Sequence, residues 1–384
     1  IRGGTLLHVG CGTKNKSRTT AGFNTEQWSE LRLDINPAVS PDVIESLVAA
    51  VGEAERPLLF AGHGVRLAGV ADEFQALVEK LGIPVVATWN AMDLLPWDHP
   101  LYVGKPGSVA MRGPNFAVQN CDLLIGLGTR LDNVVTAFNP KGFGRVAKKI
   151  IIDVDPAELK KNEDAIDLAI CADLKALVPA WLERATTTPD NNMQVWRDRC
   201  QDWKNRYQVD DFGGNEKISH YDFVSALSDA VPEDTLVTTG SSGLGVEVFY
   251  SAYRNKKGQR IFLTSGLGAM GYGLPAAIGA CFAGGCLPMV AVESDGSLQL
   301  NLQELNTLKG NDLPIRLFVL NNAGYGSIRT TQRNYFEGRY VGTGPEAGLY
   351  LPDMEKVAAS YDLPFVRIEN STEMRGQIGE VLAQ

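Results

Sequence analysis

The stretch from Met289 to Ile328 reads MVAVESDGSLQLNLQELNTLKGNDLPIRLFVLNNAGYGSI. Two apolar runs, Met289–Glu293 and Ile315–Asn321, have the Val, Ile and Leu content of strands that are buried on both faces. The segment Leu298–Lys309 between them has the pattern of an amphipathic helix. A strand–helix–strand unit of this kind predicts two parallel strands and therefore an α/β domain.

Polar residues follow each of these two strands. Asp295-Gly296-Ser297 comes after the first, and Asn321-Asn322 ends the second. Because parallel strands present their carboxyl ends at one edge of a sheet, we expect Asp295 and Asn322 to lie close together. A carboxylate, an amide oxygen and a carbonyl suit Mg²⁺, which completes its shell with phosphate oxygens and water. Backbone N–H groups opening the helix at Gly296 and Ser297 suit a phosphate. The pattern predicts a metal-bridged diphosphate site.

Each motif alone has a simpler interpretation. Asp-Gly-Ser is a common helix N-cap or turn, and Asn-Asn-x-Gly is a common turn. Their joint placement after two buried strands, separated by one amphipathic helix, favours the ligand site over two unrelated turns.

Composition narrows the class of protein. The chain has 384 residues, 44% of them hydrophobic, and a net charge of −9, which argues against nucleic acid or an anionic membrane as the main partner. Its six cysteines are scattered and form no CxxC pair, as expected for free thiols in a reducing compartment. No apolar stretch approaches the roughly 20 residues of a membrane span. These features predict a cytoplasmic protein.

Alternating strands and helices continue through most of the chain. We expect an α/β fold with two doubly wound parallel-sheet domains and a short N-terminal remnant. The predicted segments are an N-terminal remnant at 1–44, a central domain at 45–185, a linker at 186–215 and a C-terminal domain at 216–384.

The C-terminal motifs resemble the thiamine diphosphate motif, and the sequence around them is similar to the large subunit of acetolactate synthase. The resemblance covers roughly Ser46 to the C-terminus. It is carried by TSGLGAMGYGLPAAIGA at Thr264–Ala280, RPLLFAGHG at Arg56–Gly64, CDLLIGLGTRLDN at Cys121–Asn133 and IIIDVDPAEL at Ile150–Leu159.

The resemblance implies roles for individual residues. Asp295 and Asn322 would be side-chain ligands of Mg²⁺, and Gly324 would offer its carbonyl. Met270 would lie beneath thiamine diphosphate and force its bent shape, which brings the cofactor's own amino group to its reactive carbon. Without this context, a methionine in an apolar stretch would be interpreted as part of the hydrophobic core. The residues expected to contact the cofactor are Ser241, Ser242, Gly268, Met270, Gly296, Ser297, Tyr325 and Gly326.

The resemblance also implies a function. We expect an acetolactate synthase-like lyase or transferase that decarboxylates a 2-oxo acid and joins the product to a second carbonyl. The activating glutamate belongs to a pyrimidine-binding domain, expected from a homo-oligomer or a partner chain. FAD is a further cofactor that the central domain could bind, through Gly62-His63-Gly64, Gly128-Thr129-Arg130 and Asp153-Val154-Asp155, although many relatives keep this fold without flavin. A catalytically silent cofactor-binding or regulatory chain is the alternative.

Four departures from the family pattern stand out, and the first three support that alternative. Ser294 replaces a glycine at the start of the metal motif, and Gly240–Gly245 replaces a loop that usually carries Gly-Gln-His. About 45 residues precede the central segment, too few for a pyrimidine-binding domain. The chain ends at Gln384 before an expected last strand, so we expect it to be incomplete at both ends.

The first residues have a resemblance of their own. LLHVGCGT at Leu6–Thr13 and LRLDINP at Leu31–Pro37 are similar to the start of an S-adenosylmethionine-dependent methyltransferase, with Asp34 as the ribose-binding acid. Because no room remains for the rest of that fold, we expect a fused remnant rather than a methyltransferase.

Overall fold

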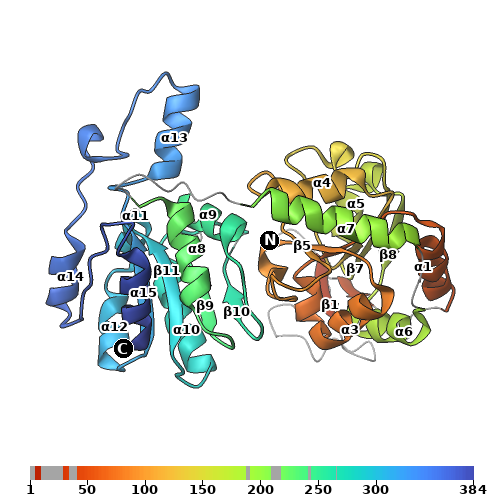
Figure 1. Ribbon diagram of the computed structural model, residues 1–384, viewed down its shortest axis with the longest axis horizontal. Coiled ribbons are helices and arrows are strands. Elements are labelled where there is room, and N and C mark those ends of the chain that lie inside the picture. The colour runs from red at the N-terminus through yellow and green to blue at the C-terminus, as the bar shows by residue number, and fades with distance from the viewer. Residues whose placement is uncertain are drawn as a thin grey trace.

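The computed structural model describes residues 41–186, 191–208, 218–240, 244–264 and 266–384, and two short strands before them. Those strands, β1 (Thr5–Val9) and β2 (Ser29–Leu33), pair in parallel. The remaining residues form two α/β units that lie side by side in Figure 1. The predicted α/β fold with two parallel-sheet domains is confirmed. The methyltransferase-like loop after β1 and Asp34 lie outside the described residues.

The central domain is built on a six-stranded sheet in the order β5-β4-β3-β6-β7-β8. All of its strand pairs are parallel. In chain order the strands are β3 (Pro57–Ala61), β4 (Val85–Ala87), β5 (Tyr102–Gly104), β6 (Leu123–Leu127), β7 (Lys148–Asp153) and β8 (Leu168–Cys171). Three of the inner strands, β3, β4 and β6, carry no polar side chain, as expected for a parallel sheet whose two faces are covered by helices.

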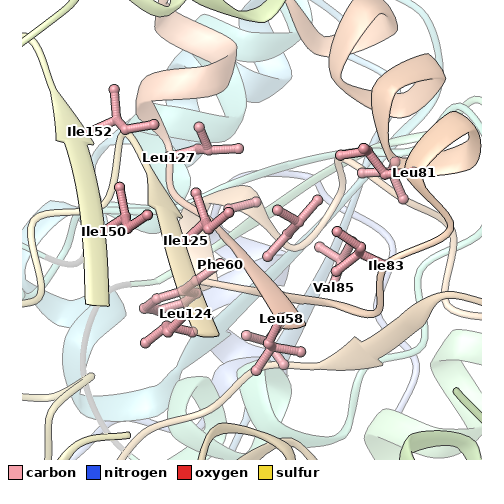
Figure 2. Packing of buried hydrophobic residues seen from close by; sticks show 14 of the residues in the cluster. Leu58, Phe60, Leu81, Ile83, Val85, Leu124, Ile125, Leu127, Ile150 and Ile152 are labelled. Atoms are coloured by element: carbon pink, nitrogen blue, oxygen red, sulfur yellow. The ribbon is translucent and has the colours of Figure 1, made fainter. Parts of the chain in front are cut away.

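Helices complete the central core, part of which is shown in Figure 2. They are α1 (Pro41–Glu53), α2 (Gly64–Leu67), α3 (Ala71–Leu81), α4 (Arg112–Asn120), α5 (Pro156–Lys161), α6 (Leu174–Arg184) and α7 (Asn191–Arg206). The expected linker contains α7, which packs against this domain: the indole of Trp196 donates to the carbonyl of Pro57 at 2.9 Å.

The C-terminal domain has a four-stranded parallel sheet in the order β10-β9-β11-β12. Its strands are β9 (Leu236–Thr239), β10 (Arg260–Phe262), β11 (Met289–Ser294) and β12 (Ile315–Leu320). Its helices are α8 (His220–Ala230), α9 (Leu244–Ala252), α10 (Gly273–Ala283), α11 (Asp295–Leu298), α12 (Glu304–Gly310), α13 (Gly326–Tyr335), α14 (Met354–Ser360) and α15 (Met374–Ala383).

One predicted helix is interrupted. The segment expected as a single helix over Leu298–Lys309 is divided into α11, a 3₁₀ turn at Gln299–Asn301 and α12. Amide side chains accompany the interruption: Asn301 donates to the carbonyl of Gly271 at 2.8 Å, and Gln299 to that of Asp295 at 3.3 Å. Hydrophobic periodicity does not report such tertiary hydrogen bonds, so the sequence pattern missed the break.

The segment between β4 and β5 joins the two domains. Trp89 stacks on Tyr250 of α9, with ring centroids 4.8 Å apart. Asn255 donates its side-chain amide to the carbonyl of Leu95 at 2.8 Å. The carboxylate of Asp93 lies between Arg66 of the central domain and Arg260 of β10, at 3.0 and 2.7 Å. The central domain therefore braces the strand that leads to the Met270 loop.

Two lysines are buried near this interface. Lys105 donates to the carbonyl of Tyr253 at 3.0 Å, and Lys204 donates to that of Tyr102 at 2.8 Å. Burial, with the neighbouring charge of Lys204, lowers the pKa of Lys105 to about 7. Burial also lowers the pKa of Lys204 to about 8, opposed by Asp98. Both ammonium groups therefore titrate far below their ordinary value of 10.5.

These pKa values predict a pH-dependent stability. The unfolded chain keeps Lys105 protonated up to about pH 10, whereas the folded chain releases this proton above about pH 7. The free energy of unfolding should therefore rise with pH across that window, by up to about 1.4 kcal/mol per pH unit for one lysine. In urea titrations at several pH values, Lys105→Met should lose the contribution of Lys105 to this slope and keep that of Lys204, whereas the exposed control Lys175→Met should keep both. Parallel curves for both variants would refute the assignment.

Among the residues that the structure describes, no helix is both long and apolar enough to span a membrane.

Candidate functional site

The pairing of β11 with β12 fixes the position of the predicted site. Ser294 and Leu320 are partners at the ends of these parallel strands, so the residues that follow them emerge together. The backbone N–H of Gly324 donates to Oδ2 of Asp295 at 3.0 Å. Oδ1 of the same carboxylate accepts from the N–H of Gly296 at 2.8 Å. The carboxylate thus connects the first turn of α11 with the turn after β12.

This edge offers oxygen ligands. Asp295 is 1% exposed, and burial raises the pKa of its carboxyl against the lowering effect of backbone N–H groups. The Oδ1 atom of Asn322 is buried without a hydrogen-bond partner. A buried acceptor left unpaired costs free energy, which a bound cation would recover. The donor set of carboxylate, amide oxygen and carbonyl therefore fits a hard divalent ion.

The described residues contain no cluster of three His, Cys, Asp or Glu side chains that could hold a metal ion. A cation at Asp295 would therefore take few ligands from this chain. Mg²⁺ commonly binds in this way, with phosphate oxygens and water filling the other positions.

An arginine holds the turn after β12. Nη2 of Arg329 donates to the carbonyls of Asn322, Ala323 and Thr343 at 3.3, 3.1 and 3.0 Å. Ala323 has a φ of +57°, which is unfavourable for a residue with a side chain. The guanidinium stabilises this conformation from the first half of α13. The turn borders a cavity of about 200 Å³ lined by Asn322, Gly326, Arg329, Thr330, Arg333 and Tyr340.

Two glycines are required by close packing at the site. Gly324 has a φ of +134°, and a Cβ added there would lie 2.4 Å from the carbonyl oxygen of Thr343. A Cβ added to Gly296 would lie 2.5 Å from the ring of Tyr325. The Tyr325 ring thus covers the start of α11, and larger residues at either position would displace the turn.

The Met270 loop reaches the same edge. The N–H of Gly271 donates to Oγ of Ser297 at 2.8 Å, and the carbonyl of Gly271 accepts from Asn301. Gly268 has a φ of +58° and turns the chain just before Met270, which is half-buried. The structure therefore brings the loop that carries Met270 to the Asp295–Ser297 turn, and the role of Met270 beneath a cofactor stays a prediction. Ser241 and Ser242 lie outside the described residues.

Glu293 is a site residue that the sequence pattern did not reveal. Its side chain is buried at the end of β11, and its two oxygens accept from the N–H groups of Gly273 and Ser294, both at 2.9 Å. Burial raises the pKa of this carboxyl, and a hydrogen bond from Ser297 opposes the shift. A single acidic residue within an apolar run is unusual, because charged side chains are rarely buried. Nothing else in the sequence indicated a role for Glu293.

His220, the first residue of α8, also faces this edge. Burial lowers the pKa of its imidazole, and the nearby carboxylate of Asp295 opposes that shift. No motif in the sequence associates the two residues. Their proximity follows from the antiparallel packing of a helix on its strand, which places the start of α8 at the carboxyl edge of the sheet.

Ser294 occupies the family's glycine position without backbone strain. Its φ is −102° and its ψ is 150°, so the backbone is extended and accepts a Cβ. One of the departures from the family pattern is therefore compatible with an intact turn.

Two of the predicted flavin segments of the central domain, Gly62–Gly64 and Gly128–Arg130, come together. The N–H of Gly64 donates to the carbonyl of Gly128 at 3.1 Å. A Cβ on Gly62 would lie 2.0 Å from that same oxygen. His63 Nδ1 lies 2.9 Å from the carbonyl oxygen of Asn90. Close packing between the β3 and β6 loops is sufficient to explain these glycines, so FAD binding stays a prediction.

Two family models match the two domains. The thiamine pyrophosphate enzyme central domain matches residues 44–181, and the C-terminal TPP binding domain of the same enzymes matches residues 239–384. Together with the arrangement of the strand ends, these matches show that the chain belongs to the thiamine pyrophosphate enzyme family. Neither match reaches the methyltransferase-like residues 1–43.

Relatives narrow the resemblance to acetolactate synthases. Acetolactate synthase 1, chloroplastic, of Zea mays is 31% identical over 360 residues, which are 91% of this chain and 55% of that protein. The acetolactate synthase large subunit of Cyanidium caldarium is 31% identical over 94% of this chain and 62% of its own length. Acetolactate synthase isozyme 2 large subunit of Escherichia coli is 32% identical over 78% and 53%. The chain spans about half the length of these relatives.

Proposed function

We propose that this chain binds thiamine diphosphate through Mg²⁺ and acts on 2-oxo acids as an acetolactate synthase-like enzyme. Two observations carry the proposal: the buried carboxylate of Asp295 accepts from the turn after β12, and the Oδ1 of Asn322 in that turn is buried without a hydrogen-bond partner. These groups stand where the carboxyl ends of β11 and β12 meet. Open α/β sheets bind their ligands at this edge.

In this proposal the side chains of Asp295 and Asn322 and the carbonyl of Gly324 hold the metal. The Met270 loop, fixed to Ser297, supports the cofactor from below. When bound, thiamine diphosphate supplies a carbon nucleophile for the carbonyl of a 2-oxo acid and an electron sink for loss of CO₂. This chain's residues bind and orient that group, and Glu293 and Arg329 keep the binding turns in place.

We propose that a second chain completes the site, either another copy or a partner that supplies the pyrimidine-binding domain. The likeness to acetolactate synthases supports this arrangement, in which the activating glutamate comes from the second chain. A catalytically silent cofactor-binding role is the alternative. It predicts the same cofactor affinity without turnover of pyruvate.

Cofactor binding is tested by calorimetric titration of thiamine diphosphate with and without Mg²⁺. Asp295→Ala and Asn322→Ala should each weaken Mg²⁺-dependent binding by more than about 100-fold, since even outer-shell changes at metal sites cost up to that much. The surface variant Asp164→Ala is the matched control and should bind like the wild type. Mg²⁺-independent binding, or unchanged affinity in folded Asp295→Ala, would eliminate the proposed site.

Turnover is tested separately, by release of CO₂ from pyruvate after cofactor and Mg²⁺ are loaded. Release that depends on Asp295 supports the enzyme. Tight binding without release, in the presence of candidate partner chains, supports the silent alternative.

A further inference from the structure

The last turn of α10 brings two cysteines together through a defined helix ending. The N–H of Gly285 donates to the carbonyl of Phe282 at 3.2 Å, and the N–H of Cys286 donates to that of Cys281 at 2.8 Å. Gly285 has a φ of +75°. These are the paired hydrogen bonds and the left-handed residue of a Schellman motif.

A Schellman motif places two particular side chains in contact. They belong to the third residue from the helix end and to the residue after the left-handed glycine. Here those positions are Cys281 and Cys286. Cys281 Sγ lies 4.0 Å from the carbonyl oxygen of Leu287, the residue after Cys286. Burial raises the pKa of the Cys281 thiol, and the neighbouring Cys286 adds to the shift. A contact that is usually hydrophobic is made by two sulfur atoms.

The two sulfurs differ in access. Cys286 is exposed, whereas Cys281 is buried beneath it, and both are free thiols. An oxidant in solution therefore meets Cys286 first, and the Schellman motif places the Cys281 thiol next to the oxidised sulfur. The helix ending already holds the two residues close together, so a bond between them needs little movement of the backbone.

We propose that Cys281 and Cys286 form a redox-active dithiol that a hydroperoxide oxidises to an intramolecular disulfide. The Cys286 sulfur attacks the peroxide, and an S–O bond forms as the O–O bond breaks. With hydrogen peroxide, this step leaves a sulfenic acid on Cys286 and releases one water. The Cys281 sulfur then attacks the Cys286 sulfur; an S–S bond forms, the S–O bond breaks, and the hydroxyl leaves with the Cys281 proton as a second water. Two thiols lose two electrons, and a thiol reductant restores them.

The position of the pair gives the modification a structural consequence. The disulfide closes a loop over Gly284 and Gly285, between the end of α10 and the start of β11. At its other end, α10 begins at Gly273, whose N–H donates to Glu293. Oxidation would fix the end of the helix that lies away from the cofactor edge. The dithiol is independent of the proposed function, because none of the expected cofactor contacts is involved.

The test is peptide mass mapping of the full-length protein after treatment with stoichiometric hydrogen peroxide, alkylation and digestion with trypsin. Arg260 and Lys309 bracket one peptide that holds both cysteines, so the internal disulfide appears as a loss of two hydrogens and two missing alkyl groups. Dithiothreitol should restore both alkylation sites. Cys171, an exposed thiol of the central domain, serves as the internal control and should not enter a disulfide within the monomer.

Two variants identify the order of the steps. In Cys281→Ser the Cys286 sulfenic acid should persist and react with dimedone, whereas in Cys286→Ser the buried Cys281 should stay reduced. Cys171→Ser should form the disulfide like the wild type. Wild-type protein that accumulates sulfenic or sulfinic acid at Cys286 while Cys281 remains alkylatable would overturn the proposal. So would oxidation that only links separate chains, detected by non-reducing electrophoresis.

Discussion

Asp93→Ala should lower the free energy of unfolding by about 3–5 kcal/mol, the usual cost of removing one partner from a buried ion pair. The Asp93 side chain is fully buried and accepts from Arg66, Arg260 and the N–H of Ile261, at 3.0, 2.7 and 2.9 Å. Its removal leaves two guanidinium groups without their carboxylate across the domain interface. The central domain and β10 should then no longer unfold together.

The placement of tryptophan makes this separation measurable. All six tryptophans precede residue 204, so their fluorescence follows mainly the part of the chain before the C-terminal domain. Trp89, which stacks on Tyr250, also follows the interface with that domain. Far-UV circular dichroism follows both domains. The two urea transitions should coincide in the wild type and separate in Asp93→Ala.

Two further variants calibrate the result. Asp93→Asn keeps the shape but loses the charge, and it should fall between the wild type and Asp93→Ala. Asp164→Ala, which removes an exposed pair with Lys141, should change stability by less than about 1 kcal/mol. Coincident transitions in Asp93→Ala, at an unchanged midpoint, would show that this carboxylate does not couple the domains.

The sequence predicted the central sheet well where strands are long and apolar. Runs of Val, Ile and Leu at 57–62, 123–128 and 149–154 in the sequence agree closely with β3, β6 and β7. The short strands β5 and β8 were missed, because three or four residues give no clear period.

The arrangement of the strand ends was also predictable, because the topology of parallel strands places Asp295 beside the turn after β12. Contacts made across the fold were not. Nothing in the sequence indicated that Arg329 would donate hydrogen bonds to three carbonyls of that turn. Nor did it indicate that Asp93 would form an ion pair with Arg260, far along the chain. Charged residues on polar stretches have no periodicity, so their partners appear only when the fold is known.

Glu293 illustrates the same limit and gives the second large prediction. Three segments of the C-terminal domain meet at its carboxylate. The N–H of Gly273 starts α10, that of Ser294 ends β11, and a Cβ added to Gly240, which follows β9, would lie 2.2 Å from the carboxylate oxygen. Glycine at 240 thus leaves the space that the carboxylate fills.

Glu293→Ala should destabilise the C-terminal domain by about 3 kcal/mol or more, since two buried N–H groups lose their acceptor and each costs about 1–3 kcal/mol. Cofactor affinity should fall as well, because Glu293 fixes the start of α10 and the turn that carries Asp295. Glu293→Gln keeps the side-chain volume and one hydrogen-bond acceptor, but its NH₂ group faces the second of the two backbone N–H groups. The loss of stability should therefore be about half of that in Glu293→Ala. Urea unfolding followed by circular dichroism, together with calorimetric titration of thiamine diphosphate, measures both effects. If the free energy of unfolding of Glu293→Ala equals that of the wild type, the Glu293 carboxylate does not hold these three segments together. The close packing at Gly240 would then need another cause.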